Sequence, residues 1–168
     1  SVVSVALSEG VTNIDDDAFY NCPSLTNISL PNGLTRIGRA AFLNCTSLSD
    51  MPLPESVTDI GAFAFSGCEL LPNLTLPGGI TSINEHTFYG CSSLADIRVP
   101  EGVTSIGFWA FKECESLQNV TLPKSLTEID DDAFCDCSPA LRFTVARGSW
   151  AENWCVRQHA AYGFSDEN

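Results

Sequence analysis

The sequence is poor in basic residues and has no long hydrophobic run. Only 8 of its 168 residues are Lys or Arg, against 21 Asp or Glu, so the formal net charge is −13 at pH 7. So few basic side chains cannot neutralise a row of phosphates, and the same charge disfavours docking on an anionic membrane. No apolar stretch approaches the roughly 18 residues that cross a bilayer. We therefore expect neither nucleic-acid binding nor direct membrane insertion.

Residue patterns for catalysis or metal binding are equally scarce. The chain has two histidines, and no serine lies in a G-x-S-x-G motif. Cys155 and His159 are four residues apart on an expected helix, but no orienting Asn or Asp accompanies them. The acidic triplets at 15–17 and 130–132 lack the spacing of a calcium loop, which favours a structural role beside backbone N–H groups. We expect no enzyme, no metal and no cofactor.

What the sequence does contain is a 23-residue repeat, [VLI]-T-x-I-x-x-x-A-F-x-x-C-x-x-L-x-x-[ILVM]-x-[LV]-P-x-x. A unit this short cannot bury a core alone, whereas stacked units share one, so the repeat predicts a solenoid. Two of its columns are Phe19, Phe42, Phe65, Phe88, Phe111 and Phe134, and Cys22, Cys45, Cys68, Cys91, Cys114 and Cys137.

Each repeat contains segments of distinct expected structure. The alternating apolar residues of L-x-x-I-x-L predict a short strand, as in Thr26–Leu30 and Gln118–Leu122, which the following proline ends. The V-T-x-I stretch suits a second extended segment, and A-F-x-x-C suits one helical or 3₁₀ turn that sends Phe and Cys inward. Parallel strands of successive coils would then form one sheet on one face.

The unit I-x-x-x-A-F-x-x-C-x-S-L-x-x-I-x-L-P resembles the BspA-like (Treponema-type) leucine-rich repeat, over nearly the whole chain. The resemblance implies a leucine-rich-repeat solenoid of the α/β type that is mostly β, coiled right-handed and curved, with a parallel concave sheet. It also implies a cell-surface or secreted protein whose repeats serve cell adhesion or non-catalytic protein binding. The implied partner is a protein, such as a host or extracellular-matrix protein, and the oligomeric state stays open. The alternative is a structural spacer that presents another domain from the cell surface.

The repeat also divides the chain. Residues 1–10 fit the end of a truncated preceding repeat, and residues 11–148 hold six repeats. Ser149 and Glu152 form an S-x-x-E capping box, and Trp150 and Trp154 follow at helical spacing. We therefore expect a C-terminal capping helix over 149–164, with Gly163 as its stop, and a frayed tail over 165–168.

The cysteines are mostly one position copied. Those of the column predict a ladder of buried thiols that fill the space after each phenylalanine. Cys135 and Cys155 lie outside the column, near the expected cap. A disulfide from Cys155 to Cys135 or to Cys137 remains an alternative for them.

Two surfaces are candidates for partner binding. On the concave face, outward strand positions are small, polar and mildly acidic, although a plain solvated sheet would look the same. An aromatic patch in a variable column has the residue types of interface hot spots, unless the rings pack on the adjacent turn. The first surface comprises Asn27, Ser29, Asp50, Asn73, Thr75, Asp96, Arg98, Asn119 and Thr121, and the second Phe63, His86, Phe108 and Trp109.

Overall fold

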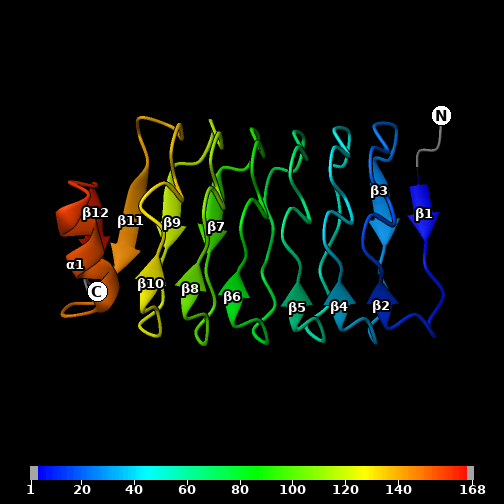
Figure 1. Ribbon diagram of the computed structural model, residues 1–168, viewed down its shortest axis with the longest axis horizontal. Coiled ribbons are helices and arrows are strands. Elements are labelled where there is room, and N and C mark those ends of the chain that lie inside the picture. Colours follow the sequence, from blue (N-terminus) through cyan, green and yellow to red (C-terminus); the bar gives the residue numbers. More distant parts are fainter. Residues whose placement is uncertain (1–3, 166–168) are drawn as a thin grey trace.

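The computed structural model describes residues 4–165, which form one row of stacked coils (Figure 1). Each coil is one repeat, and the row ends in a helix on the C-terminal side. This parallel-strand solenoid confirms the predicted fold class. Within the described residues, no helix is long and apolar enough to cross a membrane. Residues 1–3 of the predicted preceding repeat and 166–168 of the predicted tail lie outside the described range.

Two columns of short parallel strands run along the row, in opposite halves of Figure 1. The register steps by one repeat, so that Ile97 pairs with Val120 and Ile37 with Ile60. The first column contains β1 (Ser4–Ala6), β3 (Asn27–Ser29), β7 (Asp96–Arg98), β9 (Asn119–Thr121), β11 (Arg142–Val145) and β12 (Tyr162–Phe164). The second contains β2 (Asn13–Ile14), β4 (Arg36–Ile37), β5 (Asp59–Ile60), β6 (Ser82–Ile83), β8 (Ser105–Ile106) and β10 (Glu128–Ile129).

The A-F-x-x-C stretch folds as hydrogen-bonded turns rather than as a regular helix. Cys45 N donates to Phe42 O at 3.1 Å, an i to i+3 bond. Ala40, just before the stretch, and Asn44, within it, have positive φ (51° and 60°), which interrupts right-handed helical geometry. The turns also join successive coils, since Phe42 N donates to Ala64 O at 2.8 Å.

A stack of phenylalanine rings forms the centre of the core. Neighbouring rings of the column lie 5.0–5.6 Å apart at interplanar angles of 2–15°. The rings of Phe42, Phe65, Phe88 and Phe111 are fully buried. The predicted thiol ladder lies beside them: Cys68 Sγ, for example, donates to Phe42 O of the preceding coil at 3.3 Å. Each coil thus contributes one ring and one thiol to a shared core.

The C-terminal cap differs from its prediction in length. Helix α1 (Trp150–Arg157) follows its N-cap Ser149, whose Oγ accepts from Glu152 N at 3.1 Å. The predicted helix over 149–164 is wrong beyond Arg157, because the chain turns at His159 (φ 53°) and Gly163 lies inside β12. Trp154 packs edge-to-face on Phe143 at 5.5 Å and closes the core. Ser165 N still donates to Val145 O at 3.0 Å, so fraying does not begin there.

The single sheet predicted for the first column is also wrong. It divides into β1–β3 and β7–β9–β11–β12, and the two intervening coils contribute only isolated bridges, Asn27 to Asp50 and Asn73 to Asp96. Proline explains part of the break, because Pro52 has no N–H to donate to the coil before it.

Candidate functional site

The structure brings the nine predicted polar residues together along the outside of the first strand column, which we call the strand face. Most of these side chains are exposed, and Asn27 and Thr121 are half-buried. Amide and carboxylate side chains bond from coil to coil: Asn27 Nδ2 donates to Asp50 Oδ2 at 3.2 Å, and Asn119 Nδ2 to Asp96 Oδ1 at 2.6 Å. These bonds hold the side chains in place along a rigid scaffold, as a preorganised docking surface requires.

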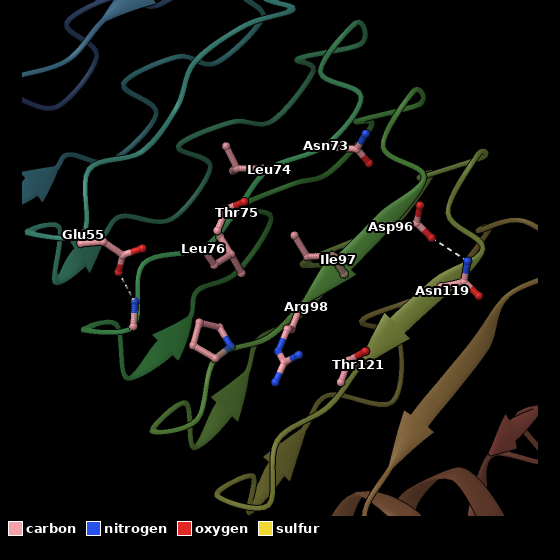
Figure 2. A pocket seen from close by; sticks show the side chains of 12 residues that line it. Glu55, Asn73, Leu74, Thr75, Leu76, Asp96, Ile97, Arg98, Asn119 and Thr121 are labelled. Atoms are coloured by element: carbon pink, nitrogen blue, oxygen red, sulfur yellow. Dashed lines mark hydrogen bonds between the residues drawn. The ribbon is translucent and has the colours of Figure 1, made fainter. Parts of the chain in front are cut away.

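A cavity of about 580 Å³ lies on this face, between the coils that carry Asn73, Asp96 and Asn119 (Figure 2). Its floor is apolar and its rim is polar. Arg98 points into it from β7, and among the described residues no side chain pairs with its guanidinium. The remaining lining residues are Glu55, Leu74, Thr75, Leu76, Gly78, Ile97, Pro100 and Thr121.

Sequence reasoning missed Glu55 and the apolar floor of this cavity. Glu55 follows Pro54 in the turn after the strand, and its Oε2 accepts from Gly78 N of the next coil at 3.2 Å. Nothing in its position within the repeat distinguishes it from other turn residues. Leu76, in contrast, belongs to the strand column of core residues, and it lines the cavity although it is almost fully buried.

The interruption is a slot between residues 49–60 and residues 72–83, one coil later. No bond between backbone N–H and backbone C=O joins these two segments, all of whose residues the structure describes; the Gly78 N–H reaches only the Glu55 side chain. The coils on either side keep backbone bonds to their outer neighbours: Ser49 N donates to Thr26 O, and Thr104 N to Thr81 O. The two segments remain connected on the turn side, where Phe65 N donates to Thr87 O at 2.9 Å.

Three departures from the repeat explain the slot. Pro72 occupies the position of Ser49, whose N–H bonds to the previous coil, and cannot donate. Gly79 occupies the position of Ser56, whose Oγ donates to Leu34 O at 2.6 Å. At Asn84 the side-chain Nδ2, and not the backbone N–H, donates to Ile60 O at 2.7 Å. A second cavity of about 230 Å³ lies between the walls, lined by residues 49–53 and 73–75.

The aromatic patch lies on the turn side of the coils and not on the strand face. Phe63 and His86 stack at 4.3 Å, and Phe108 and Trp109 stack at 4.5 Å. Phe108 is exposed and the other three rings are half-buried, because each packs on a ring in an adjacent coil. Each of the two alternatives for these residues, an exposed patch or rings packed on adjacent turns, thus holds in part. The rings pack on adjacent turns and still leave an aromatic edge in solvent.

The backbone beneath the patch is in an unusual conformation. Phe63, His86 and Trp109 have φ of 54–61°, a region that bulky residues rarely adopt and that costs of order 1–3 kcal/mol per residue. Cations lie at both ends of the row, with Arg39 over Phe63 at 5.2 Å and Lys112 over Trp109 at 4.0 Å. These contacts stabilise the rings and occupy the faces that a ligand would stack on.

The cysteines do not provide a reactive thiol. Burial raises the pKa of Cys155 to about 11, so this thiol is protonated at neutral pH, the opposite of an activated nucleophile, and His159 lies beyond the end of α1. All eight cysteines are free, and neither disulfide alternative for Cys155 is present. Cys135 instead donates to Asp132 Oδ1 at 3.3 Å.

The central carboxylate of the first acidic triplet is used within the fold. Asp16 Oδ1 accepts from Arg39 N at 2.8 Å and from Arg36 Nη2 at 2.9 Å, and these bonds hold the pKa of Asp16 below its usual value. Within residues 4–165, no group of three or more His, Cys, Asp or Glu side chains is arranged to hold a metal ion. The strand face and its slot are therefore the site that the geometry favours.

Comparison with solved structures supports this architecture. The chain is 28% identical to a T. pallidum leucine-rich-repeat protein, with a TM-score of 0.70, over 85% of this chain and 72% of that one. A leucine-rich-repeat protein from Eubacterium ventriosum is 21% identical (TM-score 0.69; 82% and 44% covered) and shares the fold. The pneumococcal vaccine antigen PcpA is more distant, at 13% identity and a TM-score of 0.56 over 97% of this chain and 67% of that one.

A search of curated proteins found no match. The family model of the BspA-type leucine-rich-repeat region matches residues 12–140 in six copies. These copies cover the same columns of phenylalanine, cysteine and leucine that build the core. The chain therefore belongs to the BspA-type leucine-rich-repeat family.

Proposed function

We propose that this protein is a non-catalytic protein-binding module and that its partner docks on the strand face. The observation that carries the proposal is the ordered polar row on that face, where side chains bond from coil to coil and the Asn119–Asp96 pair lies beside a cavity with an apolar floor. Membership of a leucine-rich-repeat family supports a role in protein–protein interaction. The finer role that we propose is adhesion, at the cell surface or after secretion.

The composition of the face suits such a role. Asn, Asp, Ser and Thr side chains offer donors and acceptors that are already positioned, so little side-chain entropy is lost on binding. The apolar floor beneath Arg98 supplies the desolvated centre that interfaces need, and the polar residues form the rim.

A binding assay with matched variants tests the proposal. The full chain is presented to host-cell and extracellular-matrix proteins, and binding is compared for Asn119→Arg, on the strand face, and Glu115→Arg, an exposed turn residue of the same coil. We expect Asn119→Arg to weaken capture at least about tenfold and Glu115→Arg to leave it unchanged. Equal capture by both variants would contradict a strand-face site and would instead suit a spacer.

A further inference from the structure

The walls of the slot carry strand-type backbone groups without partners. Toward both ends of this column a regular bond joins each coil to the next, as from Leu7 N to Ser29 O at 3.0 Å and from Val99 N to Thr121 O at 2.9 Å. In the middle of the column this bond is missing at three successive steps, of which the central one crosses the slot. The equivalent bond across the slot would run from Leu53 N to Thr75 O, and it is absent although both residues are described. An unpaired strand edge within a sheet is the kind of surface to which an extended chain adds.

The slot has room at its outer side. The cavity of about 230 Å³ between residues 49–53 and 73–75 opens beside the larger cavity over Leu76. Both volumes adjoin the same unpaired backbone. Leu74 and Leu76, which are almost fully buried, supply apolar surface for alternate side chains of an extended peptide.

The charge around the slot selects the occupant. Asp50, Glu55 and Asp96 are exposed carboxylates on its rim, and Arg98 is the one cation among the residues that line the two cavities. The whole chain carries −13 at pH 7, so its long-range field also attracts cations and repels anions. Charge complementarity therefore favours a net-basic partner over an acidic one.

We propose that the slot binds an extended, net-basic peptide segment of a partner protein, and that the backbone of this segment completes the interrupted ladder. The proposal rests on the proposed function, because it names the chemistry of the partner that docks on the strand face. The peptide donates to and accepts from the open edge at Leu53 and Thr75, and its lysine or arginine side chains pair with Asp50 and Asp96.

Three capped heptapeptides test the proposal on the full chain by NMR titration up to about 1 mM. The first alternates lysine with valine or threonine, the second replaces lysine by glutamate, and the third is the lysine peptide with N-methyl groups on alternate residues. The third keeps the charge but loses the backbone donors. We expect the lysine peptide to shift the amides of Asp50, Met51, Leu53 and residues 73–76, and the other two to bind at least about tenfold more weakly.

Two variants with a matched control extend the test. Pro72→Ser with Gly79→Ser restores the residues that other repeats use at these positions, so the slot should close and peptide binding should fall. Asp50→Asn with Asp96→Asn should weaken binding about three- to tenfold at low salt, whereas Glu69→Gln, a single charge removed from an exposed turn, should not. Circular dichroism identifies any variant that fails to fold. If the Pro72→Ser with Gly79→Ser variant fails to fold, the binding measured for the Asp50→Asn with Asp96→Asn variant tests the proposal.

The proposal would be overturned if the N-methylated peptide bound as tightly as the lysine peptide, or if the amide shifts fell outside residues 50–53 and 73–76. Absence of any binding of the lysine peptide at about 1 mM would overturn it as well. None of these outcomes would by itself remove the proposed function. A partner protein whose capture still depends on Asn119 would keep the strand face as a docking surface and leave only the peptide chemistry wrong.

Discussion

At the scale of single residues, the cysteine column shows how one position serves every coil. Each buried thiol fills the space after a phenylalanine and donates to the carbonyl of the phenylalanine one coil earlier, as Cys91 does to Phe65 O at 3.2 Å. Burial raises the pKa of Cys68, Cys91 and Cys114 well above the usual value, and that of Cys45 to about 11. The column therefore stabilises the fold only while its thiols are protonated.

We expect the free energy of unfolding to fall steeply as the pH rises from about 9 to 11. Unfolded thiols lose their protons near pH 9, whereas those of the folded chain keep them, so the unfolded state binds fewer protons and gains stability. Each fully buried thiol adds up to about 1.4 kcal/mol per pH unit. Urea unfolding at several pH values measures the slope, and Cys68→Ala with Cys91→Ala should make it shallower. An unchanged slope in that double variant would contradict this origin.

At the scale of secondary-structure elements, strand ladders and the helix cap determine which coils are joined by hydrogen bonds and which are not. The β7, β9 and β11 strands pair in continuous register, while the neighbouring slot has no backbone-to-backbone bond across its walls. At the other end, α1 is held by a reciprocal capping box, in which Glu152 Oε2 accepts from Gly148 N at 2.6 Å and Ser149 Oγ accepts from Glu152 N. The cap covers the last phenylalanines, so its own stability protects the end of the core.

Amide hydrogen exchange should be fastest, among the strand residues of the interior coils, at the walls of the slot. Leu53 N lacks the bond that protects Val99 N and Leu122 N, so its amide is open without any unfolding. Exchange followed by NMR at neutral pH tests this directly. Protection at Leu53 equal to that at Val99 would show that the ladder is closed in solution.

Removing the N-cap should destabilise the C-terminal end. Ser149→Ala deletes the acceptor for Glu152 N and should cost about 1 kcal/mol of unfolding free energy. Val156→Ala, at an exposed position of the same helix, is the matched control and should change it by less than about 0.5 kcal/mol. Urea denaturation measures both, and equal effects would mean that the cap bond carries no stability.

At the scale of the whole molecule, the stack makes position along the row as important as residue type. Phe88 lies between Phe65 at 5.5 Å and Phe111 at 5.2 Å and is 1% exposed. Phe19 has the same place in its repeat but stacks on Phe42 alone and is half-buried. Identical sequence positions thus have different energies, because each coil is stabilised chiefly by its two neighbours.

Phe88→Ala should therefore cost about 3–5 kcal/mol, as for other large cavities in a core, and Phe19→Ala clearly less. Equilibrium unfolding of the two variants gives the comparison, with the wild-type chain as reference. Similar losses at both positions would show that the N-terminal coil is packed as tightly as the interior.

The sequence by itself determined the repeat length, the inward columns and the parallel stacking, because a 23-residue step with fixed apolar positions has one way to share a core. It also placed the polar row on one face, since side chains of a strand alternate between its two sides. Helix α1 was predicted from its capping box, but β12 was not, because Tyr162–Phe164 become a strand only by pairing with β11.

The tertiary structure alone decided the slot and the exposure of the aromatic patch. Pro72 and Gly79 are visible in the sequence as departures from the repeat. A ladder, however, joins two coils, so a donor missing from one coil leaves backbone acceptors of the other coil unpaired. In the same way, the exposure of Phe63 and His86 depends on rings in neighbouring coils. Local pattern decides which way a side chain points, whereas the separation of adjacent coils decides which backbone groups and ring edges remain free.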